Sequence, residues 1–152
     1  MHVAHYLGLL HRAQVDLGDA FGEIADGHAA EQDIVHLGHK LAADCRRHAE
    51  GLRPFVDRYG EDAPAEPDRL HAEIFQGPRE GPIGLLRDLH DLYLMAAQCD
   101  MAWTLIGQAA RGLRDRDLLE VVTTCEGETA IQMQWLKTRM KQAAPQALHV
   151  AS

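Results

Sequence analysis

Apolar residues recur at steps of three and four along four long stretches of the chain, the spacing of one buried face of an α-helix. The stretches cover residues 2–26, 31–59, 82–113 and 115–144. The pattern is most regular in the third stretch, whose apolar stripe is Leu85, Leu89, Leu92, Ala96, Cys99, Trp103, Ile106, Ala110 and Leu113. We therefore predict four long helices, each with one face turned towards a shared core.

Residues that commonly start and stop helices stand at the ends of these stretches. Gly27 suits the C′ position after the first helix, and Gly60 follows the second. Pro82 suits the first turn of the third helix, and Asp115 can accept a hydrogen bond as the N-cap of the fourth. Pro145 then ends the fourth helix. These residues and the periodicity predict the same helix ends.

The connections between the predicted helices indicate their directions. The first and second helices are joined by a few residues, as are the third and fourth, so each pair forms an antiparallel hairpin. The connection over residues 60–81 is much longer, and compact domains seldom contain so long a loop without a reason. We predict that it crosses over the length of the bundle, with a short helix at residues 67–75, so that the third helix runs parallel to the second. The chain, residues 1–152, is then a single all-α domain.

Charge and composition exclude several classes of function. With 15 basic and 23 acidic residues, the net charge of 15 − 23 = −8 opposes binding to nucleic acid and to anionic membrane surfaces. No apolar run approaches the ~20 residues of a membrane-spanning helix. The N-terminus has neither the basic nor the apolar part of a signal peptide. Three cysteines, an odd number, in such a chain favour free thiols and a cytoplasmic location.

Polar and thiol side chains fall at the midpoints of the predicted helices, on the apolar stripes. Each of the three cysteines lies near the middle of a different helix. Helices of similar length in a bundle meet at the same level at their midpoints. We therefore predict one layer at mid-bundle, whose members are Gln14, Cys45, His48, Cys99, Cys125 and Glu128, with Gln132 one turn away.

With one long crossover between two helical hairpins and a Cys45-x-x-His48 step at mid-bundle, the chain resembles the ferritin-like superfamily, in particular its small bacterial four-helix-bundle members. In the di-iron members, two helices each supply a Glu and the other two each supply Glu-x-x-His. By position, the Glu-x-x-His slots fall on Cys45/His48 and on Cys125/Glu128, and only His48 keeps its ligand type. Residues 81–119 contain no Glu, so the carboxylate expected there is also missing. The resemblance thus implies the fold without the di-iron centre.

The layer at mid-bundle is open to three interpretations. In the first it is structural: free thiols pack as small hydrophobic groups, and His48 and Glu128 form a hydrogen-bonded pair. In the second it binds a soft metal such as Zn or Cu(I), with ligands drawn from Cys45, His48, Cys99, Cys125 and Glu128. In the third, His48 activates one cysteine for thiol redox chemistry, which burial of the thiol would oppose. We favour the first interpretation.

Acidic residues also flank a histidine near the start of the third helix, at Asp88, His90 and Asp91. Because acidic side chains interact favourably with the N-terminal end of the helix dipole, we predict a structural role at the helix start. No nucleophile-elbow, phosphate-loop or dinucleotide-binding motif occurs in the sequence, and we predict no catalytic residue.

These observations predict a non-catalytic protein that acts by assembly or by binding a protein partner. Apolar residues outside the core stripes need cover, and they suggest a homodimer: Leu9, Leu86, Tyr93, Met95 and Met101. The alternative is a metal-binding or redox protein that uses the layer at mid-bundle, with Zn or Cu as the cofactor rather than two irons.

Overall fold

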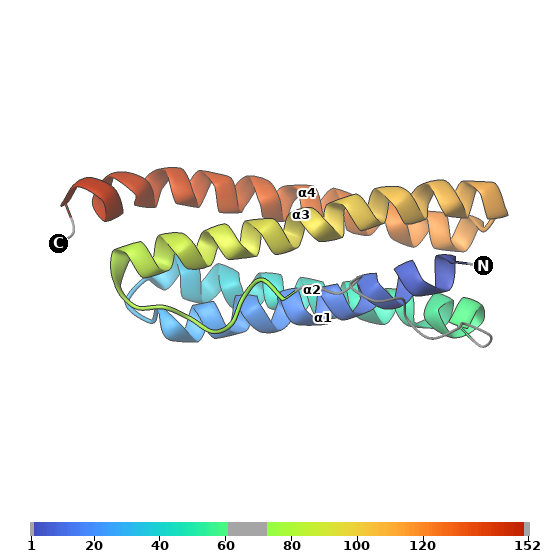
Figure 1. The fold of residues 1–152 in the computed structure, drawn as a ribbon, viewed down its shortest axis with the longest axis horizontal. Helices are drawn as coiled ribbons and strands as arrows, with labels where there is room; N and C mark the ends of the chain where they lie inside the picture. Colours follow the sequence, from blue (N-terminus) through green and yellow to red (C-terminus); the bar gives the residue numbers. More distant parts are fainter. Residues whose placement is uncertain (1, 61–72, 151–152) are drawn as a thin grey trace.

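The computed structural model describes residues 2–60 and 73–150, and nearly all of these residues are helical (Figure 1). Four long α-helices are followed by a short π-helix: α1 (Val3–Gly27), α2 (Gln32–Gly60), α3 (Gly81–Leu113), α4 (Arg116–Pro145) and η1 (Gln146–Val150). The described residues contain no strand. The all-α four-helix bundle is therefore confirmed, and every predicted helix end lies within one residue of the observed one.

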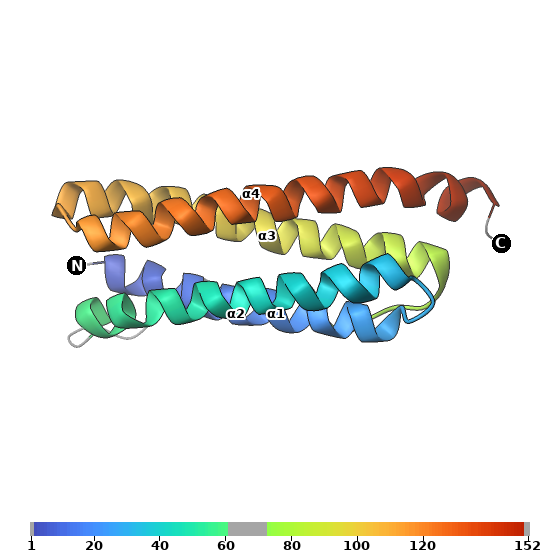
Figure 2. The ribbon, with the colours of Figure 1, turned by 180° about the vertical axis from the view of Figure 1, so that it is seen from behind.

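The four helices form two antiparallel hairpins that pack side by side. α1 lies against α2 and α3 lies against α4, while α1 also contacts α3 and α2 contacts α4. Figures 1 and 2 show that α2 and α3 run in the same direction. These two helices occupy diagonal corners of the bundle, since no close backbone contact joins them. The direction of α3 predicted from the long connection is thus confirmed.

Only the end of the connection between α2 and α3 belongs to the described residues. Residues 73–80 contain no helix and run along α1 towards the start of α3 (Figure 1). Phe75 is partly buried against the core there. The short helix predicted at residues 67–75 lies mostly outside the described residues, and its last three residues are not helical. This part of the connection is held by side-chain packing rather than by secondary structure.

Asp115 caps α4 as predicted. Its carboxylate accepts a hydrogen bond from the backbone N–H of Leu118 at 3.1 Å, the usual N-cap contact. The same carboxylate accepts hydrogen bonds from the Tyr59 hydroxyl at 2.6 Å and from Arg58 at 2.9 Å. Burial alone would raise the pKa of Asp115, but these hydrogen bonds outweigh it and the pKa is lowered. Asp115 therefore joins the end of α2 to the start of α4.

The prediction that Gly27 is the C′ residue of α1 is wrong. Gly27 is the last residue of the helix, and His28 follows as the C-cap with φ −123°, so no left-handed residue ends α1. The connection explains the glycine instead, because a Cβ at position 27 would lie 2.7 Å from the Cβ of Pro78. A residue without a side chain lets the connection pass this close to the helix.

A second correction concerns the acidic residues of α3, which do not lie at the helix start. Asp88 lies more than one turn into α3 and has no exposed surface, Asp91 is also buried, and His90 is exposed. Asp88 accepts hydrogen bonds from His28 Nε2 at 2.7 Å, from the backbone N–H of Arg79 at 2.9 Å and from the Arg79 guanidinium at 2.8 Å. Arg79 also donates to Asp91 at 2.9 Å. This Asp88 cluster (His28, Arg79, Asp88 and Asp91) ties the end of the connection to the end of α1.

The apolar core runs the length of the bundle and draws residues from all four helices, with Trp103 and Phe21 as its largest buried side chains. On α3 the core residues all come from the stripe that the periodicity predicted, although Leu113 at the end of that stripe is exposed. None of the helices in the described part of the chain combines the length and the apolarity needed to cross a lipid bilayer.

Candidate functional site

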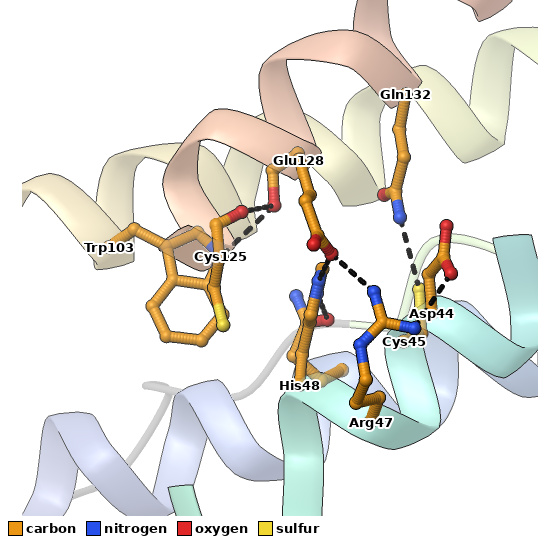
Figure 3. A network of polar contacts seen from close by, with 10 residues as sticks. Asp44, Cys45, Arg47, His48, Trp103, Cys125, Glu128 and Gln132 are labelled. Atoms are coloured by element: carbon orange, nitrogen blue, oxygen red, sulfur yellow. Dashed lines mark hydrogen bonds and ion pairs between the residues drawn. The ribbon is translucent and has the colours of Figure 1, made fainter. Parts of the chain in front are cut away.

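Polar and thiol side chains from all four helices are buried near the middle of the bundle, and Figure 3 labels those of α2 and α4. Five of them are almost fully buried and are named here the central layer: Gln14, Cys45, His48, Cys99 and Gln132. Glu128 lies at the edge of this layer with its side chain 35% exposed, and Cys125 is buried one turn before it on α4. These residues are the ones predicted from the helix midpoints to share one level. Hydrogen bonds join His48 to Gln14 and to Glu128, and Gln132 donates to Cys45.

His48 is held at both ring nitrogens. Nδ1 lies 3.0 Å from Oε1 of Gln14, and Nε2 lies 2.6 Å from Oε2 of Glu128. The ring also packs edge-to-face against Trp103, with ring centroids 6.0 Å apart. Trp103 is oriented in turn by a hydrogen bond from its Nε1 to Oγ1 of Thr129 at 3.1 Å. The hydrogen-bonded pair of His48 and Glu128 predicted from the sequence is confirmed.

Arg47 belongs to this site, although the sequence analysis missed it. It donates to Oε2 of Glu128 at 2.6 Å and to Asp44 at 3.0 Å (Figure 3). The pKa of Glu128 is lowered, first by the hydrogen bond from His48, with burial acting in the opposite direction, and then by Arg47. An arginine on the exposed side of a helix usually indicates only a solvated surface, and the one local signal is its i,i+3 spacing from Asp44. Glu128 is thus an ionised carboxylate shared by two donors at neutral pH.

All three cysteines are free thiols, and their surroundings do not favour redox chemistry. Burial raises the pKa of Cys45, of Cys99 and of Cys125 to about 12. A thiol with such a pKa is almost wholly protonated at neutral pH and is a weak nucleophile. In the part of the chain that the structure describes, the hydrogen bonds of His48 go to Gln14 and Glu128 and not to a thiol.

The cysteines fall into two groups. Cys45 and Cys99 are near enough that, after burial, a charge on Cys99 is the next cause of the raised pKa of Cys45. Cys125 instead neighbours Glu128. After burial, the charge of Glu128 is the next cause of the raised pKa of Cys125. The three thiols therefore share a level in the bundle without forming one group.

Two buried amides turn towards the sulfurs of the first group. Nε2 of Gln132 lies 3.8 Å from Sγ of Cys45. Burial is the main cause of the raised pKa of Cys99. The amide of Gln14, which faces this thiol as a donor, lowers that pKa. Nε2 of Gln14 and Oε1 of Gln132 nevertheless have no hydrogen-bond partner among the described residues. Unpaired buried polar atoms are rare in native proteins, so the pairing of the central layer is incomplete.

A pocket of about 410 Å³ opens between α2 and α4 beside the central layer. His48 and Cys125 line it together with the carboxylates of Asp117, Glu120 and Glu128. The pocket explains why Glu128 reaches solvent while His48, its partner, is buried. Cys45 and Cys99 are not among the lining residues, so they are separated from this opening.

The five predicted metal ligands are not assembled as one ligand set. Among the described residues, no three His, Cys, Asp or Glu side chains are grouped so as to hold a metal ion. His48, Cys125 and Glu128 line the pocket between α2 and α4, and His48 is hydrogen-bonded to Glu128, whereas Cys45 and Cys99 do not line it. A site shared by all five stays a prediction, and a di-iron centre would lack the carboxylates that it needs.

Comparisons with known proteins assign no family to the chain. Neither the protein-family models nor searches of curated proteins and of solved structures gave a match. The function is therefore inferred from the sequence pattern and from the geometry of the bundle.

Proposed function

We propose that the protein is a non-catalytic four-helix-bundle protein of the ferritin-like type that acts by assembling into a homodimer. The observation that carries this proposal is an apolar groove of about 290 Å³ between α1 and α3. This α1–α3 groove is lined mainly by Tyr6, Leu9, Met95, Met101, Ala102 and Leu105.

Large apolar side chains around the α1–α3 groove are exposed to solvent. Met101 is 59% exposed, Leu105 is 45% exposed and Tyr6 is 40% exposed. Apolar surface that gathers in one place marks a site where another surface binds, whereas scattered single residues need no explanation. Of the five residues that the sequence pattern selected as needing cover, Leu9, Met95 and Met101 line the groove, whereas Leu86 and Tyr93 do not.

A second copy of the chain is the occupant that suits this face. The groove provides a hollow, and Met101 and Leu105, which line it, are well exposed, so the same face offers both a hollow and apolar side chains to a second copy. Among the described residues that line the groove, Asp16 alone is charged at neutral pH. This matters because two copies with a net charge of −8 each repel one another over most of their surface. Charge repulsion therefore opposes association little at the α1–α3 groove.

The ferritin-like part of the proposal is supported by topology and by two residues. α2 and α3 run in parallel and are joined by a long connection, which is the helix order of that superfamily. His48 and Glu128 stand at mid-bundle, where the di-iron members carry ligands. Gln14, Cys45 and Cys99 stand where further carboxylates would be needed. We infer a bundle of this type that works without two irons.

The polar interior supports a structural rather than a catalytic role. His48 is engaged at both ring nitrogens. The three thiols are protonated at neutral pH, because burial raises the pKa of each. Free thiols also suit the reducing conditions of the cytoplasm, where we place the protein.

Sedimentation velocity of the purified full chain at neutral pH tests the assembly. We expect a dimer for the wild type and a monomer for Met101→Glu, because the interface would desolvate the new carboxylate next to its symmetry mate. Ile131→Glu is the matched control, since Ile131 is 69% exposed on α4 and lies outside the groove, and it should remain dimeric. Circular dichroism verifies that both variants are folded.

Two results would contradict the proposed assembly. One is a wild type that stays monomeric at high micromolar concentration. The other is a dimer that withstands Met101→Glu as well as it withstands Ile131→Glu, because the interface would then lie on another face.

A further inference from the structure

We propose that the two copies of the dimer lie antiparallel, so that the Tyr6 hydroxyl of each copy donates a hydrogen bond to the Asp16 carboxylate of the other. The two-fold axis then runs across the α1–α3 groove, at right angles to the helices. This inference rests on the homodimer proposed above. It adds the direction in which the second copy lies and the polar contacts that select this direction.

Two polar side chains stand at opposite ends of the groove. Asp16 and Met95 line both the groove and a second pocket on the acidic side of α1, so they mark one end. α1 and α3 run in opposite directions, so Tyr6 and Leu105 mark the other end (Figure 1). Ten residues separate Tyr6 from Asp16, which is about 15 Å along α1. Met101 lies close to the midpoint between Met95 and Leu105.

Each of these polar groups is what the other lacks. Among the residues that the structure describes, neither the Tyr6 hydroxyl nor the Asp16 carboxylate has a hydrogen-bond partner. Tyr6 is 40% exposed and Asp16 is half-buried, so both lose water when a second copy covers the groove. A carboxylate that loses water without gaining a donor destabilises the interface. A hydroxyl donor to a carboxylate instead forms one of the stronger hydrogen bonds.

The direction of the two-fold axis decides whether these groups meet. With the axis at right angles to the helices, α1 faces the partner's α1 with its direction reversed, so Tyr6 meets the partner's Asp16. On α3, Met95 then meets the partner's Leu105, and Met101 lies next to its own symmetry mate. With the axis along the helices, α1 faces the partner's α3 at the same level, and Asp16 meets the partner's Met95. Both polar groups are then covered by apolar side chains, which is the costly arrangement.

The charges along α1 favour the same arrangement. Residues 3–14 contain Arg12 and no acidic residue, whereas residues 15–27 contain no Lys or Arg. The acidic residues of the second half are Asp16, Asp19, Glu23 and Asp26. Antiparallel α1 helices place each acidic half against a half that has no acidic residue. Parallel α1 helices would place acidic residues opposite one another, and like charges across an interface destabilise it.

Disulfide cross-linking between full-length variants tests the arrangement. Tyr6→Cys, Asp16→Cys and Leu105→Cys proteins are mixed in pairs, left to exchange subunits and oxidised with diamide. A disulfide needs Cβ atoms about 4 Å apart, so Tyr6→Cys mixed with Asp16→Cys should give a covalent dimer on a non-reducing gel. Tyr6→Cys mixed with Leu105→Cys should give none. Each variant alone should also give none, because equal positions lie about 15 Å apart, and the three native thiols are buried.

Hydrogen-bond variants give a second measurement that needs no disulfide. Tyr6→Phe and Asp16→Ala should each raise the Kd of the dimer roughly 30-fold in sedimentation equilibrium, because either change removes both reciprocal hydrogen bonds. The double variant should dissociate no more readily than either single variant, since the two residues act as one pair. Tyr93→Phe is the matched control, because Tyr93 also lies on α3 but does not line the groove, and its Kd should be that of the wild type.

Two results would overturn the antiparallel arrangement. One is a disulfide from Tyr6→Cys to Leu105→Cys in place of one to Asp16→Cys. The other is an Asp16→Ala protein that dimerises more tightly than the wild type. In both cases the wild type still sediments as a dimer that Met101→Glu dissociates, so assembly through the groove stands. A monomeric wild type removes the dimer and the arrangement together, and sedimentation velocity shows this before any cross-linking.

Discussion

Two buried polar clusters of this bundle differ in how completely their hydrogen bonds are formed. In the Asp88 cluster, both carboxylate oxygens of Asp88 are paired, one with Arg79 and the other with Arg79 and His28. In the central layer, Gln14 and Gln132 each have one atom without a hydrogen-bond partner among the residues that the structure describes. A buried charge is stable only when it is paired and hydrogen-bonded, so the Asp88 cluster fastens the fold. The central layer, with fewer of its hydrogen bonds formed among the described residues, should contribute less to stability.

The two clusters also join different kinds of segments. The Asp88 cluster links α3 to the end of α1 and to the connection before α3, so it determines how that connection lies. The central layer joins helices that already pack together through apolar residues on either side. Substitutions in the two clusters should therefore change stability by different amounts and in different directions.

The largest effect is expected for Asp88→Asn. The new amide keeps the shape of the carboxylate but turns an NH2 group towards Arg79 or His28, which then lacks an acceptor. Because loss of one partner of a buried ion pair costs several kcal/mol, and because Arg79 is partly exposed, the free energy of unfolding should fall by about 3 kcal/mol in urea. Asp26→Asn is the control, since Asp26 also pairs with a histidine, His39, but its side chain is 76% exposed. Its effect should stay within about 0.5 kcal/mol, and an equally small effect of Asp88→Asn would remove the difference between the clusters.

Gln132→Met should have a smaller effect of the opposite sign. The thioether fills a similar volume and removes a buried carbonyl that has no partner, while only a weak N–H to sulfur contact is lost. We expect this variant to gain about 1 kcal/mol in the free energy of unfolding, measured with urea. The same change at Gln134, which is exposed on α4, should stay within about 0.5 kcal/mol. A clear loss of stability in Gln132→Met would mean that the central layer is as well satisfied as the Asp88 cluster.

The smallest effect concerns pH and the edge of the central layer. The pKa of Glu128 lies below its ordinary value of 4.5, first because of the hydrogen bond from His48. A lowered pKa in the folded state contributes stability above pH 4.5, and this contribution is lost as the pH falls through the folded pKa. Glu128→Gln should therefore cost about 0.5 kcal/mol at pH 7, since the carboxylate is partly exposed, and less at each step towards acid. Urea denaturation of both proteins at pH 7, 5 and 4 measures this, and a difference that does not change with pH would contradict it.

The sequence by itself determined the four helices, their ends and the direction of α3. These features depend on local information: the steps of three and four along each stripe, the proline at position 82, the N-cap Asp115 and the length of each connection. Neighbouring residues supply all of it. This is why every helix end lies within one residue of its prediction, whereas the role of Gly27 depends on Pro78, far along the chain.

The sequence determined less about the polar clusters, because their members come from distant segments. Asp88 shares the buried face of Leu85 and Leu92 at helical spacing, so its burial had a local signal. Its partners did not: His28 lies 60 positions away along the chain. Arg47 was missed for the same reason, since Glu128 is 81 positions away.

Only the tertiary structure decided how the cysteines divide. Counting residues along a helix gives the level of each side chain, because every residue rises about 1.5 Å. The direction of a side chain across the bundle depends on the rotation of the helix about its own axis, at roughly 100° per residue. The packing of all four apolar stripes sets that rotation. It places the sulfur of Cys45 beside the amide of Gln132 and turns Cys125 towards the pocket between α2 and α4.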